Sequence, residues 1–118
     1  MRALYEEYKI ILERKNGLGA DGEKSYTRYL FSEGINKILK KIGEESAELI
    51  IAAKDAANGS GAEDSGKLVV EETADLFYHV LIMLAELGVS LADIEAELES
   101  RANKPGNLKE FKAVDKNT

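Results

Sequence analysis

Two groups of acidic residues have the types and the spacing of a divalent-metal site. Glu44, Glu45 and Glu48 form an EExxE pattern, and Glu72 with Asp75 forms an ExxD pattern. At 100° per helical residue, each group falls on one side of a helix, so its carboxylates can act together. Carboxylate oxygens are hard ligands that suit Mg²⁺ or Mn²⁺, and Mg²⁺ in proteins usually joins carboxylates to substrate phosphates. The spacing therefore predicts a metal centre for phosphate chemistry.

The EExxE pattern taken alone is more typical of a solvated helix surface, on which glutamates pair with lysines one turn away. The ExxD pattern is harder to explain as part of a solvated helix surface. Glu72, Asp75 and His79 lie in KLVVEETADLFYHVLIMLAEL, which is apolar around nearly its whole circumference. An unpaired carboxylate in such a face costs several kcal/mol or takes up a proton. We therefore expect a cation, a basic partner or a water-filled pocket to compensate these groups.

Cationic and aromatic residues near the two acidic groups are candidates for contacts with a substrate: Lys37, Lys41, Lys54, Tyr26 and His79. For each lysine, an ordinary surface pair with a nearby glutamate is an equally good explanation. A single histidine on an apolar helix is more often a satisfied core residue than a ligand. Tyr26 and Tyr78 face either a nucleotide or the core, and the core is the commoner place for aromatic residues at helical spacing.

Helices must position these residues, because the apolar residues recur every three or four positions and glycines separate the segments. We predict an all-α fold with four helices and one short turn between the first two. The helices are expected over 1–14, 33–57, 67–87 and 90–101, and the turn over 26–31, capped by Ser25 or Thr27. The glycine-rich segment 58–66 is expected to be a flexible connection between antiparallel helices, which brings the two acidic groups face to face.

The predicted architecture is a four-helix-type bundle over 1–103, followed by a polar tail over 104–118. The helix over 67–87 has more apolar surface than three other helices can cover, so we expect a homodimer to complete the bundle.

Composition excludes several classes of protein. The chain has 118 residues with Lys+Arg 16 and Asp+Glu 22, a net charge of −6, one histidine and no cysteine. The acidic balance argues against nucleic-acid binding, and the missing cysteines exclude disulfides and thiolate metal sites. Neither a signal peptide nor a membrane span is predicted, and we expect a cytoplasmic protein.

Two stretches carry a family resemblance: SYTRYLFSEGINKILKKIGEESAELIIAAK and VVEETADLFYHVLIMLAELGVSLADIEAEL. They closely resemble the phosphoribosyl-ATP pyrophosphohydrolases of histidine biosynthesis, over most of residues 1–101. The chain is similar more broadly to the all-α nucleoside triphosphate pyrophosphohydrolases, whose signature is EExxE on one helix and ExxD on the next. The resemblance implies Mg²⁺-dependent hydrolysis of phosphoribosyl-ATP to phosphoribosyl-AMP and pyrophosphate by a dimeric helical enzyme.

We accordingly expect metal-assisted attack of water on the α–β phosphate linkage, with the five carboxylates as metal ligands or water-orienting groups. One carboxylate not fully committed to the metal is expected to act as general base, and the sequence does not select it.

Two features depart from the family pattern. The connection over 55–66 is longer than usual, and the cyclohydrolase domain that is often fused to this family is missing, so a separate cyclohydrolase is expected to perform the next step.

Two alternatives stay open at this point. One is a related pyrophosphohydrolase that acts on another nucleoside triphosphate, with the same metal site and a different substrate pocket. The other is a non-enzymatic helical dimerisation module, which leaves the acidic residues inside the apolar stripe of 67–87 unexplained.

Overall fold

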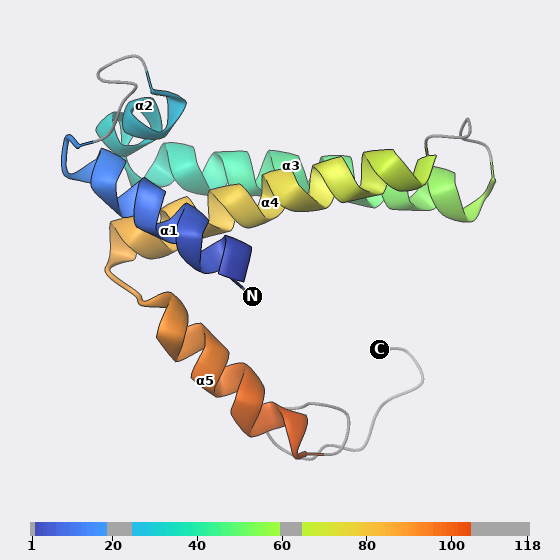
Figure 1. Ribbon diagram of the computed structural model, residues 1–118. Coiled ribbons are helices and arrows are strands. Elements are labelled where there is room, and N and C mark those ends of the chain that lie inside the picture. The colour runs from blue at the N-terminus through green and yellow to red at the C-terminus, as the bar shows by residue number, and fades with distance from the viewer. Residues whose placement is uncertain (1, 19–24, 60–64, 105–118) are drawn as a thin grey trace.

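The protein is all-α in the computed structural model, which describes residues 2–18, 25–59 and 65–104 (Figure 1). These residues form five helices and no strand. The helices are α1 (Arg2–Lys15), α2 (Tyr26–Glu33), α3 (Ile35–Ala57), α4 (Ser65–Leu87) and α5 (Leu91–Ala102). The predicted fold class is confirmed. Parts of the predicted connection and tail, namely 60–64 and 105–118, lie outside the described residues.

α3 and α4 form the long arm of the molecule. Each has 23 residues, and α4 starts at Ser65, two residues before the predicted start. The two helices run antiparallel and side by side, as the sequence predicted. α1 crosses α4 at one end of the arm, and α2 packs beside α3 at the same end (Figure 1). The pairing of α3 with α4 places the middle of one helix opposite the middle of the other, where both acidic groups lie.

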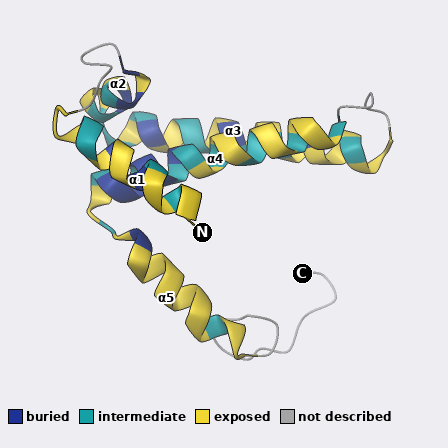
Figure 2. Cartoon of the chain, in the orientation of Figure 1, coloured by how far each residue is buried: buried dark blue, intermediate teal, exposed yellow. Residues whose placement is uncertain are grey.

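Buried residues concentrate at the end of the arm where α1 and α2 meet the hairpin (Figure 2). Apolar side chains from α1, α2, α3 and α4 interlock there, and the fully buried ones are Ile11, Leu30, Ile38 and Ile82. Burying one such side chain contributes about 1.5–3 kcal/mol. The core therefore fixes the hairpin at one end and leaves the rest of the arm accessible.

The region between the first two long helices differs from the sequence prediction. α2 is a helix of 8 residues rather than a short turn over 26–31, and Ser25 is its N-cap, accepting a hydrogen bond from the Arg28 N–H. The predicted start of the next helix at Glu33 is also wrong. Glu33 ends α2, and Gly34, at a positive φ of 91°, separates α2 from α3. Only glycine adopts this conformation without strain, so the chain turns there.

α5 leaves α4 with a bend of 114° and projects away from the arm (Figure 1). Its N-cap is Ser90, whose hydroxyl accepts a hydrogen bond from the Asp93 N–H at 3.1 Å. Residues 92–100 are all exposed. Within the described part of the chain, no single helix is long and apolar enough to cross a membrane; α4 and α5 pass that test only when taken together across their bend.

Substitutions at Ile82 should measure the contribution of this core. Ile82 is fully buried, so Ile82→Ala leaves a cavity and is expected to lower the free energy of unfolding by about 2–5 kcal/mol. Ile82→Val removes one methyl group and should lower it by about 0.5–1.5 kcal/mol. Urea unfolding at one protein concentration measures both. An alanine variant no less stable than the valine variant would contradict the packing described here.

Candidate metal centre

Three carboxylates from α3 and α4 converge in the middle of the arm. Glu45 comes from α3, and Glu72 and Asp75 come from α4; each offers an oxygen, and these oxygens lie within 4.8 Å of one another. Mg²⁺ holds its ligands at about 2.1 Å, so small side-chain rotations bring all three oxygens onto one ion. The antiparallel hairpin thus brings together residues from the EExxE and ExxD patterns.

The cluster contains buried oxygens for which the described residues provide no hydrogen-bond partner. Glu45 is only 7% exposed, and Oε2 of Glu45 and Oε2 of Glu72 are buried without a hydrogen-bond partner in the described part of the chain. Burial, and then the nearby charge of Glu48, raises the pKa of Glu45. Burial and the neighbouring carboxylates Glu48, Asp75 and Glu45 likewise raise the pKa of Glu72. Buried anionic oxygens without partners are the donors that a hard cation compensates, so these residues fit a divalent metal.

The other two acidic residues of the EExxE pattern lie beside this cluster. Glu48 is exposed and interacts with both Glu45 and Glu72. Glu44 instead turns to Lys41, whose Nζ lies 3.0 Å from its Oε2 and 3.7 Å from Oε1 of Glu45. This ion pair lowers the pKa of Glu44 and raises that of Lys41. Lys41 therefore bridges the outer and inner glutamates of α3.

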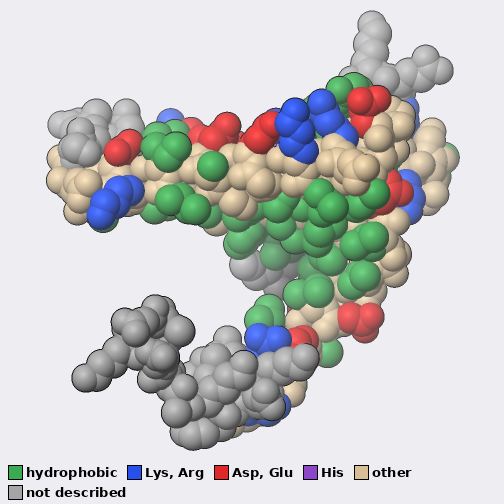
Figure 3. Space-filling model, turned by 180° about the vertical axis from the view of Figure 1, so that it is seen from behind, with side chains coloured by type: hydrophobic (Ala, Val, Ile, Leu, Met, Phe, Trp, Pro, Cys, Tyr) green, Lys and Arg blue, Asp and Glu red, His purple; other side chains and the backbone are tan. Residues whose placement is uncertain are grey.

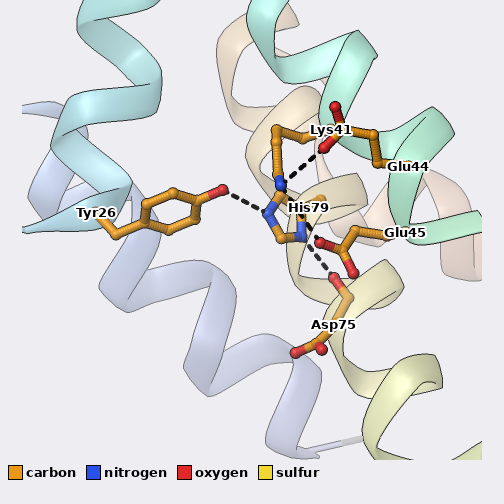
Figure 4. Close-up of polar contacts among 6 residues, drawn as sticks. All are labelled: Tyr26, Lys41, Glu44, Glu45, Asp75 and His79. Carbon is orange, nitrogen blue, oxygen red and sulfur yellow. Dashed lines mark hydrogen bonds and ion pairs between the residues drawn. The ribbon is translucent and has the colours of Figure 1, made fainter. Parts of the chain in front are cut away.

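His79 links the cluster to α2 through two hydrogen bonds (Figure 4). Its Nδ1 lies 2.7 Å from the backbone oxygen of Asp75, and its Nε2 lies 3.0 Å from the Tyr26 hydroxyl. A carbonyl oxygen only accepts, so Nδ1 carries a proton, and in the neutral imidazole Nε2 accepts from Tyr26. Burial raises the pKa of Tyr26, which keeps this phenol protonated as the donor. Both ring nitrogens are thus used within the chain, and His79 orients Tyr26.

The remaining predicted residues lie at different distances from the cluster. The Nζ of Lys37 lies 5.9 Å from the ring centroid of Tyr29, on the side of the site nearest α2. Lys54 lies in the last turn of α3, about 13 Å along the helix axis from Glu45. Tyr78 does not face the cluster through its hydroxyl, which hydrogen-bonds to the buried Thr27.

Tyr29 is a neighbour of the site that the sequence analysis missed. It lies three residues after Tyr26 on the exposed side of α2, and the two rings stack with centroids 6.3 Å apart. A full helix over 26–33 places residues i and i+3 on one face, so the signal was present in the spacing. Because only a short turn was predicted over 26–31, Tyr29 was not placed on the same helix face as Tyr26.

Comparison with known proteins relates most of the chain to one family. A family model described as phosphoribosyl-ATP pyrophosphohydrolase matches residues 4–102. The chain is 45% identical over 107 residues to the phosphoribosyl-ATP pyrophosphatase of Streptococcus thermophilus, covering 91% of this chain and 92% of the relative. It is 44% identical over 112 residues to the protein of the same name from Listeria welshimeri (95% and 94%). With the one from Pelotomaculum thermopropionicum, identity is 48% over 97 residues (82% and 88%).

The raised pKa of Glu45 predicts how stability depends on pH in the absence of metal. A pKa above the unfolded value, about 4.3, gives stability that is complete below that pH and is lost as pH rises through the folded-state pKa. Glu45→Gln imitates the protonated form. In EDTA, we expect Glu45→Gln to be more stable than the wild type at pH 7, with the difference shrinking towards pH 4.

Chemical unfolding across this pH range measures that difference, and titration with MgCl₂ provides the control. Divalent metal should stabilise the wild type more than Glu45→Gln, because the substitution removes one anionic ligand. A Glu45→Gln variant that is less stable than the wild type at pH 7 in EDTA would show that Glu45 is not held in an unfavourable charged state.

Proposed function

The chain belongs to the phosphoribosyl-ATP pyrophosphohydrolase family, and from this membership we infer that it hydrolyses phosphoribosyl-ATP to phosphoribosyl-AMP and pyrophosphate in histidine biosynthesis. We propose Mg²⁺ as the cofactor, with Mn²⁺ as a possible substitute. The metal proposal rests on the convergence of Glu45, Glu72 and Asp75; among the described residues, one buried oxygen of Glu45 and one of Glu72 have no partner.

We assign the residues of the chain to distinct tasks. Glu45, Glu72 and Asp75 hold the metal, and Glu44 holds Lys41 in place beside them. When bound, Mg²⁺ neutralises charge on the phosphate oxygens and lowers the pKa of a coordinated water.

Glu48 fits the role of general base for the water that attacks the α–β phosphate linkage. It is exposed to solvent, it lies beside Glu45 and Glu72, and it is not a member of the three-residue group that converges most closely. A carboxylate that is not fully committed to a metal can accept a proton from a neighbouring water. No covalent nucleophile is needed for this hydrolysis.

Lys41 and Lys37 are proposed to contact the substrate phosphates. Both lie on α3 on the stripe that leads to Glu45, and a cation there offsets the negative charge that phosphate brings to an acidic centre. Lys54 is a candidate only for the far end of a long substrate, given its place in the last turn of α3.

The product, phosphoribosyl-AMP, is proposed to pass to a phosphoribosyl-AMP cyclohydrolase. The family match over residues 4–102 assigns one activity, so the next step of the pathway falls to another catalytic unit. A cytoplasmic location fits an enzyme that acts on a nucleotide intermediate of amino-acid biosynthesis.

Pyrophosphate release tests the proposed reaction. The purified protein should release pyrophosphate from phosphoribosyl-ATP with Mg²⁺, and EDTA should stop the release. Glu48→Gln should lower kcat by about 10²–10⁴-fold, the usual contribution of a general base. Glu72→Gln should weaken Mg²⁺ binding and so raise the Mg²⁺ concentration that activity requires. Glu71→Gln, an exposed neighbour outside the cluster, should behave as the wild type.

Two results would contradict the proposal. Release mainly from ordinary nucleoside triphosphates would assign the metal centre to a different substrate. Full activity of Glu72→Gln with unchanged Mg²⁺ dependence would remove Glu72 from the metal site. Circular dichroism of each variant provides the control, because none of these isosteric changes should alter the helical content.

We also propose that the enzyme is a homodimer. Figure 3 shows hydrophobic side chains gathered along the inner side of the bend between the α3–α4 arm and α5. A groove in this bend is lined by apolar residues of α1, α4 and α5, among them Leu4, Phe77, Leu91 and Ile94. Phe77 is 43% exposed and Leu98, farther along α5, is 54% exposed. Contiguous apolar surface of this kind typically marks a protein interface, and a second copy supplies a matching one.

The extended shape supports the same proposal. The radius of gyration is 17.0 Å, against about 13–14 Å for a compact chain of this length. A monomer of this shape leaves much of α4 and α5 uncovered.

Sedimentation equilibrium tests the dimer. The wild type should sediment as a dimer, and Phe77→Asp should shift it towards the monomer, because a charge in the groove must be desolvated on association. Ile10→Asp is the matched control: Ile10 is 38% exposed on α1 and does not line the groove. A monomeric wild type, or equal dissociation by both substitutions, would refute this interface.

A further inference from the structure

Two tyrosines of α2 form an exposed aromatic pair beside the metal centre. Tyr26 and Tyr29 are each 44% exposed, and their rings stack with centroids 6.3 Å apart and planes inclined by 27°. The buried face of α2 is made by other residues, Thr27 and Leu30. The pair therefore contributes little to the core and presents its rings to solvent.

The chain fixes this pair relative to the acidic cluster. The Tyr26 hydroxyl bonds to His79 at 3.0 Å, and the two rings meet edge to face with centroids 5.8 Å apart. His79 is in turn bonded to the backbone of Asp75 at 2.7 Å. Figure 4 shows Tyr26 reaching from α2 towards His79, with Glu45 and Asp75 on the far side of the imidazole. Two hydrogen bonds thus connect the aromatic pair to a residue of the metal centre.

Cations lie between the aromatic pair and the carboxylates. Lys37 lies 5.9 Å from the centroid of the Tyr29 ring, and Lys41, one turn later on α3, contacts Glu44 and Glu45. From α2 towards the middle of the arm, the order is aromatic rings, ammonium groups and carboxylates. A nucleotide has the matching order of a flat base, phosphates and the metal ion that phosphates bring.

We propose that Tyr29 is a base-recognition residue, on which the purine ring of the substrate stacks while its phosphates extend past Lys37 and Lys41 to the acidic cluster. The proposal rests on the function inferred above and names the part of the substrate that α2 recognises. Stacking suits an exposed tyrosine because every base offers a π-face. The contact with Tyr26 already orders the Tyr29 ring, so binding a base costs little further side-chain entropy. Tyr29 is thus a base-binding residue that adds affinity for the purine ring of the substrate.

Binding of two probes by isothermal titration calorimetry tests this role without turnover. AMP carries a purine and a phosphate, and ribose 5-phosphate carries only the sugar and phosphate. Tyr29→Ala should weaken AMP binding by about fivefold to a hundredfold, the usual loss when a stacking aromatic is removed. Tyr29→Phe should bind AMP as the wild type does, and ribose 5-phosphate binding should be the same in all three proteins.

Glu33→Ala is the matched control, because Glu33 is an exposed residue one turn later on α2. It should leave AMP binding unchanged. With phosphoribosyl-ATP, Tyr29→Ala should raise KM and leave kcat largely intact. The proposal is overturned if Tyr29→Ala binds AMP as the wild type does, if Tyr29→Phe loses as much as Tyr29→Ala, or if the wild type does not bind AMP. Failure of pyrophosphate release by the wild type would instead contradict the proposed function, since AMP binding requires no turnover.

Discussion

The burial of carboxylate oxygens between α3 and α4 is the constraint on which the rest of the structure depends. Glu45 is almost fully buried, and one oxygen each of Glu45 and Glu72 has no partner in the described chain. Leaving such groups charged in a low-dielectric environment is costly, and three neighbouring carboxylates add mutual repulsion. The helix pair tolerates this arrangement because apolar packing elsewhere holds α3 against α4, and the proposed metal ion would offset the repulsion.

The packed core and the acidic cluster accordingly lie in different parts of the same α3–α4 hairpin. The core lies at the end of the arm, where α1 also holds the C-terminal end of α4. There the Tyr8 hydroxyl donates to the Val89 carbonyl at 2.7 Å, and Lys15 donates to the Ala85 carbonyl at 2.8 Å. Ala85 lies in the last turn of α4, where carbonyls lack helical partners, and Val89 lies two residues past the end of the helix. With this end fixed, the middle of the arm can keep an unfavourable charge cluster without loss of the fold.

α2 connects the two parts. Its buried side, Thr27 and Leu30, belongs to the packed end of the molecule, whereas Tyr26 on its other side reaches the cluster through His79. The sharp turn at Gly34 makes this possible, because it lets α2 and α3 pack against each other instead of forming one continuous helix. The same short helix therefore contributes to the core and presents aromatic rings beside the proposed active site.

The sequence by itself determined the helical fold and the identity of the acidic groups, because apolar periodicity and carboxylate spacing are local properties of the chain. It also determined the antiparallel pairing of the two acidic helices, because only a short connection joins them. Only the tertiary structure distinguished Glu45, Glu72 and Asp75, which converge, from Glu44, which turns to Lys41. It also decided that His79 is satisfied on both ring nitrogens and that Tyr29 joins Tyr26. These outcomes depend on the rotation of each helix about its axis and on side-chain conformation. Both are set by packing against other helices, which spacing along one helix does not specify.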